Sequence, residues 1–193
     1  MIREWSTTEI IAQGIGYIGL VMCILSFQFK KHKTVLLFRT LSEPFFAAQY
    51  LLMGAYTGCA ACLLGVVRNL VFTRVVEKGR STLPWQILFG AVYTLAGILT
   101  WEGPLSLFVI TAKLISTVAY GISDTMIVRI MSLPASFCWM AYNIICFATA
   151  GILTEIISEI SIVVGFVRLD VPRIKAARAE KKAALTEERR PRK

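Results

Sequence analysis

The chain has 193 residues, of which 56% are hydrophobic and 17% are charged. Soluble domains average about 45–50% apolar and about 25% charged residues, so this composition excludes a soluble globular fold and predicts an all-α, polytopic membrane protein. The net charge of +9 does not indicate nucleic-acid binding, because nine lysines and arginines follow Pro172 and others lie in short gaps between apolar runs.

Seven apolar runs follow one another, and each is long enough for a transmembrane helix, because a bilayer core about 30 Å thick needs about 20 helical residues. They cover residues 10–29, 34–53, 56–76, 84–101, 105–122, 126–147 and 150–169. The gaps at 53–55, 102–104 and 123–125 are so short that neighbouring helices must run antiparallel. We therefore expect one compact seven-helix bundle.

Lysines and arginines mark one side of this expected bundle. They gather in the first loop (30–33), the third loop (74–80) and the tail (172–193), whereas the second, fourth and sixth loops have none. Because cytoplasmic loops carry an excess of lysine and arginine, segment 1–9 is predicted outside the membrane and the tail in the cytoplasm. The tail is rich in alanine, lysine and glutamate, so we expect a short helix in the cytosol or against anionic lipid headgroups.

An internal repeat divides the chain. The hexads at 39–44 and 129–134 both read R-x-x-S-x-P, at an offset of 90 residues. The pattern predicts two parallel three-helix repeats, at 10–76 and 105–169, joined by a linker helix at 84–101 (a 3+1+3 order). Parallel repeats related by an axis along the membrane normal are a transporter architecture, with the solute site between the repeats near the middle of the membrane.

Several segments between residues 10 and 170 carry a family resemblance. They include Leu25-Ser-Phe-Gln-Phe-Lys30, Tyr50-Leu-Leu-Met-Gly-Ala-Tyr-Thr-Gly58, Arg68-Asn69, Trp139-Met-Ala-Tyr-Asn143 and Gly151-Ile-Leu-Thr-Glu155. On these segments the chain resembles the bacterial inner-membrane YgjV family, within the SWEET and PQ-loop (MtN3-like) transporter superfamily. The resemblance implies the 3+1+3 fold and the inner membrane more directly than it implies a chemistry.

The same resemblance implies solute-facing residues. In the SWEET relatives a tryptophan on the middle helix and an asparagine on the third helix of each repeat face the solute, and Trp139 and Asn69 match these positions. Glu159 stands where the second asparagine would be, which argues against a neutral sugar and fits a cationic solute or proton coupling. Asn143 follows Trp139 by one helical turn, so an aromatic ring above an amide would suit a planar solute. The alternative is an interfacial or core tryptophan.

Charged side chains at bilayer depth are costly and by default indicate a functional site. Lys113 and Glu159 lie near the middle of their runs, where an ion pair between them would offset the burial of both charges. Glu155 lies one turn from Glu159, and two carboxylates so close repel each other unless Lys113 or Arg68 compensates their charge. The group predicts a proton or cation site, with a purely structural buried network as the alternative.

The two hexads contribute further candidates. Arg39 and Glu43 are four residues apart and can pair on one helix face. Pro44 and Pro134 remove a backbone hydrogen bond at equivalent points of two helices. These prolines are therefore candidate hinges, or kinks that serve packing.

Metal, cofactor and enzyme sites are not expected. All five cysteines lie inside apolar runs, and the Cys59-x-x-Cys62 pair lacks a second pair or nearby histidines. No HExxH, paired aspartate or Ser/His arrangement is present, and the only histidine, His32, lies in a loop.

These features predict a small-solute transporter that rocks two three-helix sets against each other. The alternative is a membrane protein that does not transport and acts as a receptor or assembly partner. The expected partners are the lipid bilayer and an unidentified small solute, without nucleic acid. A homo-oligomer is an open alternative to a monomer.

Overall fold

The computed structural model describes residues 6–27, 29, 31–122 and 124–188, and these residues form helices joined by short turns, without strands. The helices are α1 (Thr7–Phe27), α2 (His32–Leu52), α3 (Tyr56–Glu77), α4 (Leu83–Leu99), α5 (Leu105–Tyr120), α6 (Thr125–Ile145), α7 (Thr149–Gly165) and α8 (Val171–Glu188). A π-helical segment, η1 (Phe166–Asp170), joins α7 to α8. The predicted all-α fold is confirmed over the described residues, and each predicted apolar run corresponds to one helix.

Local chemistry explains where several of these helices begin. At the start of α1, the Glu9 amide donates to Ser6 Oγ at 3.2 Å and the Ser6 amide donates to Glu9 Oε2 at 2.8 Å, which is a capping box. Before α6, Asp124 Oδ1 accepts from the Met126 amide at 2.9 Å. Together with the Arg173 guanidinium, this bond holds the pKa of Asp124 below its usual range. Gly103, in the turn before α5, has φ of +102°, a conformation that glycine adopts without a steric cost.

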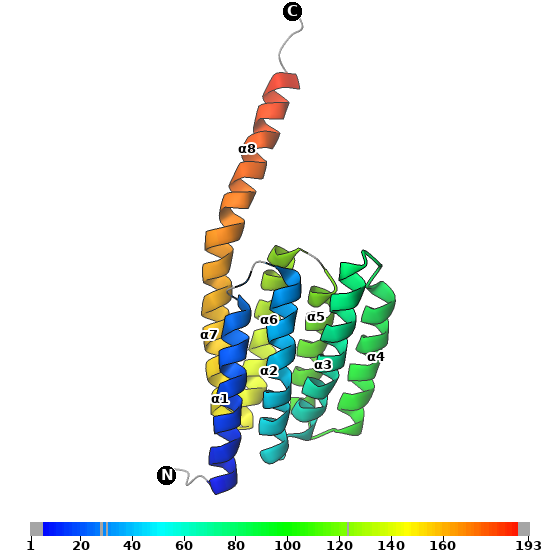
Figure 1. Ribbon diagram of the computed structural model, residues 1–193, viewed down its shortest axis with the longest axis vertical. Coiled ribbons are helices and arrows are strands. Elements are labelled where there is room, and N and C mark those ends of the chain that lie inside the picture. Colours follow the sequence, from blue (N-terminus) through cyan, green and yellow to red (C-terminus); the bar gives the residue numbers. More distant parts are fainter. Residues whose placement is uncertain (1–5, 28, 30, 123, 189–193) are drawn as a thin grey trace, which may run out of the picture.

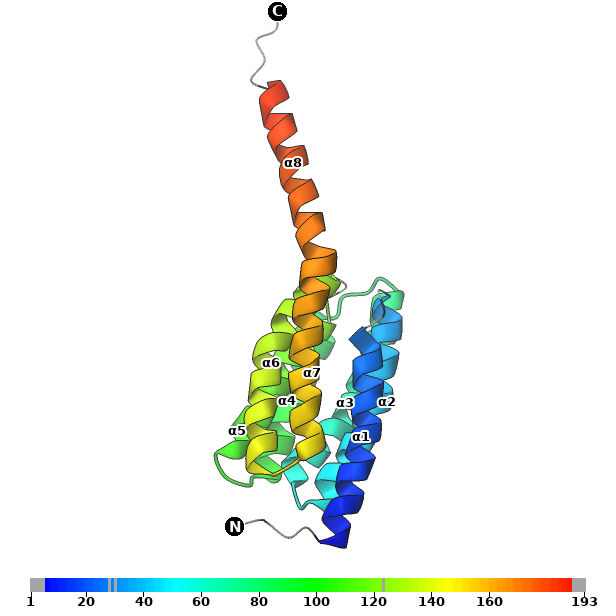
Figure 2. The same ribbon diagram turned by 90° about the vertical axis from the view of Figure 1, so that its left-hand side faces the viewer.

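The contacts between helices describe a closed ring of six helices, and Figures 1 and 2 show the helices of the bundle running side by side. Helix α2 packs between α1 and α3, and α6 packs between α5 and α7. Contacts between α1 and α7 and between α3 and α5 close the ring, while α4 packs on the outside against α3 and α5. Helix α8 continues beyond α7 and extends away from the bundle, at the end opposite to the start of α1. We call these two ends the α8 end and the α1 end.

The bundle is apolar outside and polar inside. Large aliphatic side chains are exposed on its outer surface, for example Leu99 at 76% and Ile87 at 67%. Arg68, Lys113 and Asn143 lie in the interior and are at most 4% exposed. Water would favour the reverse distribution, so this surface is suited to lipid.

Among the described residues, three helices are long and apolar enough to cross a membrane: Thr7–Ser26, Tyr56–Glu77 and Thr149–Lys181. Helices α4 and α5 are apolar but shorter. Helices α2 and α6 are the ones that carry the two R-x-x-S-x-P hexads, and each contributes several polar residues to the lining of the central cavity. Their lower hydropathy therefore reflects the site that they line.

Candidate functional site

A cavity of about 80 Å³ lies at the centre of the ring and is lined by residues from all six ring helices. Its charged lining residues are Arg39, Glu43, Arg68, Lys113 and Glu155. Its serines are Ser42, Ser116, Ser132, Ser136 and Ser158, and its aromatic residues are Phe46, Tyr50, Tyr120 and Trp139. The cavity has room for several water molecules, and its lining can both donate and accept hydrogen bonds.

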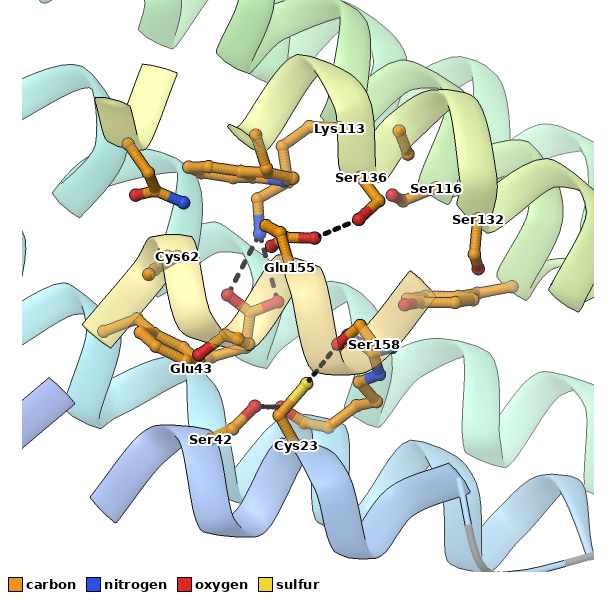
Figure 3. A pocket seen from close by; sticks show the side chains of 18 of the residues that line it. Cys23, Ser42, Glu43, Cys62, Lys113, Ser116, Ser132, Ser136, Glu155 and Ser158 are labelled. Atoms are coloured by element: carbon orange, nitrogen blue, oxygen red, sulfur yellow. Dashed lines mark hydrogen bonds and ion pairs between the residues drawn. The ribbon is translucent and has the colours of Figure 1, made fainter. Parts of the chain in front are cut away.

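Lys113 of α5 and Glu43 of α2 form an ion pair across this cavity. The Lys113 Nζ lies 3.0 Å from each carboxylate oxygen of Glu43, and Figure 3 shows the two side chains pointing toward one another. The ammonium also lies 5.3 Å from the centre of the Trp139 ring, a favourable cation–π distance. The prediction that Lys113 pairs with Glu159 is wrong, because Glu43 occupies the inner face of α2 opposite Lys113.

Arg68 is a second buried cation, and its guanidinium donates hydrogen bonds to neighbouring side chains. Its Nε and Nη2 donate to Asn69 Oδ1 at 3.1 and 3.0 Å, and Nη1 donates to Thr117 Oγ1 at 3.3 Å. The guanidinium lies over the rings of Tyr93 and Tyr120, at 5.6 and 4.9 Å from their centres. Since its Nη2 is also 4.0 Å from Glu43 Oε1, Arg68 adds to the charge that stabilises Glu43.

Asn69 therefore lies behind Arg68 rather than at the cavity surface. It is fully buried, and its oxygen accepts from Arg68, whereas its Nδ2 has no hydrogen-bond partner among the described residues. Its predicted contact with a solute stays a prediction. The geometry gives it a role in positioning the guanidinium.

Glu155 of α7 lines the cavity and accepts a hydrogen bond from Ser136 of α6 (Figure 3). Glu159, one turn further along α7, is not among the lining residues of the described cavity, and its Oε1 is buried without a hydrogen-bond partner in the part of the chain described. The structure thus brings Glu155, but not Glu159, to the cavity wall. The roles predicted for both in proton or cation binding stay predictions.

Aromatic side chains cover the cavity toward the α1 end. The rings of Tyr50 and Trp139 are stacked with centres 5.8 Å apart, and Tyr142 packs edge-on against both. The Tyr50 hydroxyl donates to Asn143 Oδ1 at 2.7 Å. Trp139 and Asn143 therefore lie together at the cavity, as the sequence predicts, but Tyr50 already uses the Asn143 oxygen.

Gln13 of α1 closes the seam between α1 and α7 at this same end. Its Oε1 accepts from Thr149 Oγ1 at 2.9 Å, from the Ala150 amide at 3.1 Å and from Gln49 Nε2 at 2.9 Å. Its Nε2 donates to the Phe147 carbonyl at 3.1 Å. One side chain thereby links α1, α2 and the start of α7.

A second polar network closes the seam between α3 and α5 at the α1 end. Glu102 Oε1 accepts from the amides of Tyr56 and Thr57, and Thr57 Oγ1 lies 3.1 Å from Ser106 Oγ. The Tyr142 hydroxyl donates to Glu102 Oε2 at 3.5 Å. Both seams of the ring are thus closed at the α1 end.

A smaller cavity of about 40 Å³ lies on the α8 side of the central one. The two cavities share Arg39, Tyr120 and Ser132 in their linings. Two of these shared residues, Arg39 and Tyr120, have long side chains.

Sequence reasoning missed Glu43 as the partner of Lys113 and missed the serines. The pair Ser132 and Ser136 is separated by one helical turn, and this polar spacing in an apolar run was a usable signal. Pro44 and Pro134 are exposed on the outer faces of α2 and α6, next to residues that line the cavity. Their predicted role as hinges stays a prediction.

Cys59 and Cys62 are free thiols. The described residues contain no group of three or more histidine, cysteine, aspartate or glutamate side chains placed to hold a metal ion.

Gly65 of α3 makes room for the ion pair, and this can be tested. A Cβ at Gly65 would come within 2.6 Å of Glu43 Cδ, so Gly65→Ala is expected to lower the free energy of unfolding by about 1–3 kcal/mol through overpacking. Gly14→Ala is the matched control, because no atom lies within 4 Å of a Cβ there, and its higher helix propensity predicts a gain of up to about 1 kcal/mol. Unfolding of both variants in mixed micelles measures the difference, and equal effects would show that Gly65 is not required for this packing.

An apolar outer surface around a charged, hydrogen-bonded interior defines the class of α-helical integral membrane proteins. The chain belongs to the Imp-YgjV family of bacterial inner membrane proteins, whose sequence model matches residues 10–173. Comparison with curated proteins yields no match, and comparison with solved structures yields none. The family assigns the chain to the bacterial inner membrane, in contact with the lipid bilayer.

Proposed function

We propose that the protein is a small-solute transporter of the inner membrane, with its solute site in the central cavity. The observation that carries this proposal is the cavity itself: charged and serine-lined, it is enclosed by six helices whose outer faces are apolar. Charged side chains at this depth in a membrane are costly, and by default they indicate a functional site. A cavity closed at one end, with a second cavity toward the other end, is what one state of a transporter requires.

The proposal includes the 3+1+3 order. The two sets are α1–α3 and α5–α7, with α4 as the linker, and all seven helices cross the bilayer. Contacts between α1 and α7 and between α3 and α5 are equivalent under a twofold axis that exchanges the sets, and this equivalence supports a parallel repeat of the superfamily type. Opening would then separate the sets along these two seams.

The proposed orientation has the N-terminus outside and the α8 end in the cytoplasm, because the basic loops lie at the α8 end. In this orientation the Gln13 and Glu102 networks close the outer side. Glu155 is the proposed proton or ammonium acceptor, because it is the one carboxylate that lines the cavity without contacting Lys113 among the bonds described.

Thiol labelling tests the proposal. In a variant with all five cysteines replaced, Ser136→Cys would place a thiol in the cavity wall, and Thr94→Cys, on the exposed face of α4, is the control. We expect a membrane-impermeant thiol reagent to label position 136 from either side of the membrane, because a transporter opens its site alternately. Labelling from one side only, or from neither, would contradict transport.

One observation favours the alternative of a receptor or assembly partner. Helix α8 extends away from the bundle and carries basic residues such as Arg178 and Lys181, which would suit an acidic partner in the cytoplasm. Labelling of position 136 from one side only would support this second candidate.

A further inference from the structure

We infer that Lys113 changes its carboxylate partner when the two three-helix sets separate, from Glu43 of α2 to Glu155 of α7. This inference deepens the transporter function proposed above and rests on it for the movement of the sets. It follows from how the charged side chains around the central cavity are divided between the two sets.

The Lys113–Glu43 pair crosses the boundary between the sets. Glu43 lies on α2 in the first set and Lys113 on α5 in the second, and the Lys113 Nζ lies 3.0 Å from both oxygens of Glu43. The two side chains are 13% and 5% exposed. Separation of the sets must therefore break this pair, and a buried charge that loses its partner is strongly destabilising unless another charge replaces it.

Glu43 has replacement cations within its own set. Arg68 of α3 places its Nη2 4.0 Å from Glu43 Oε1, and Arg39, one turn earlier on α2, also interacts electrostatically with Glu43. The Arg68 Nη1 donates across the boundary to Thr117 Oγ1 of α5 at 3.3 Å, so separation would release this donor. Because both cations move with Glu43, the first set can keep this carboxylate compensated by itself.

Lys113 has a replacement carboxylate within its own set. Glu155 of α7 lines the same cavity and interacts electrostatically with Lys113, and Figure 3 shows both side chains directed into this part of the cavity. Glu155 also interacts electrostatically with Arg39 of the first set, and separation would remove that cation. Among the lining residues described, Lys113 is the cation that the second set supplies, so we expect it to pair with Glu155 once the sets part.

Ser136 holds Glu155 in place for this exchange. Its hydroxyl donates to the Glu155 carboxylate, and because α6 and α7 belong to the same set, this bond survives the separation. The exchange also gives the proposed cation site at Glu155 a way to empty, because the Lys113 ammonium competes with a bound proton or ammonium for the same carboxylate.

Thiol labelling of the purified full-length protein in detergent tests this inference, because the reagent then reaches both ends of the bundle. The reporter is Ser116→Cys in the variant with all five cysteines replaced, since Ser116 lines the cavity and donates to the Ala112 carbonyl. We expect Glu155→Gln to slow labelling about fivefold or more, because Lys113 then has only Glu43 and holds the sets together. Glu43→Gln is expected to raise the rate by a similar factor, because Lys113 then pairs with Glu155.

The opposite effects of the two carboxylates distinguish an exchange from a fixed structural pair. Glu77→Gln, at an exposed pair with Lys33, is the control and should leave the rate unchanged. A rate that does not fall in Glu155→Gln, or does not rise in Glu43→Gln, would overturn the inference. If one of these two variants fails to fold, the direction of change in the other still decides.

Sidedness and direction separate the two proposals. Labelling of position 136 in membranes from one side only would remove transport, whereas a wrong direction of change at position 116 in detergent would remove the exchange alone. No labelling of position 116 in any variant would show that the sets do not separate and would remove both.

Discussion

Lys113→Met is expected to lower the free energy of unfolding by about 3–5 kcal/mol, because it leaves the Glu43 carboxylate buried without its nearest cation. The pair joins α2 to α5 across the ring, with both N–O distances at 3.0 Å and side-chain exposures of 5% and 13%. Arg68, at 4.0 Å from Glu43 Oε1, compensates only part of the lost charge. Unfolding by a denaturing detergent in mixed micelles measures the loss.

A double variant distinguishes charge from packing. Adding Glu43→Gln to Lys113→Met removes the uncompensated carboxylate, so the double variant should lose clearly less stability than Lys113→Met alone. Lys33→Met is the matched surface control, because the Lys33–Glu77 pair is exposed and such pairs contribute under about 1 kcal/mol. Strictly additive losses at 43 and 113 would mean that the two side chains do not interact.

Asp170→Asn is expected to lower the free energy of unfolding by about 3 kcal/mol and to release η1 from α6. Arg129 of α6 donates from Nε and Nη2 to the two Asp170 oxygens at 2.8 and 2.7 Å, and the Asp170 side chain is 3% exposed. Such a two-point pair is strong and directional, and Asp170→Asn removes the carboxylate charge that compensates the Arg129 guanidinium here. The pair holds the π-helical segment where α7 leaves the bundle.

The effect should be local as well as global. Hydrogen exchange is expected to rise most in residues 166–175, because the pair is the main polar contact described between η1 and α6. Arg173→Gln is the control, since its pair with Asp124 is largely exposed and should contribute under about 1 kcal/mol. Uniformly increased exchange over the whole bundle, or no change near η1, would contradict this assignment.

The helices could be predicted because each depends on its own residues. The seven apolar runs correspond to α1–α7 with shifts of a few residues at their ends. The largest difference is at 150–169, where the regular helix ends at Gly165 and a π-helical segment follows. This change lies at the Arg129–Asp170 pair, which joins residues 41 positions apart in the chain.

The candidate site could be predicted only in part. The sequence identified Lys113 and Glu155, because charged residues in apolar runs are conspicuous, whereas Trp139 came from the family resemblance and Asn143 from its spacing to Trp139. All four line the cavity. It could not identify Glu43 as the partner of Lys113, since hydropathy does not set how α2 and α5 are rotated about their axes. The serines were missed for a related reason: a hydroxyl is common in a helix, and only five of them around one cavity make a site.

By itself the sequence determined that these helices belong to a membrane protein, and three of the described helices are long and apolar enough to cross a membrane. Each helix can be predicted from its own residues, because a backbone in hydrocarbon must satisfy its hydrogen bonds within its own segment. Only the tertiary structure decided that Lys113 faces Glu43, that Arg68 is enclosed by Asn69 and two tyrosines, and that Glu159 lies away from the cavity. Those contacts depend on the order of the helices around the ring and on their rotation, which arise when separate segments pack together.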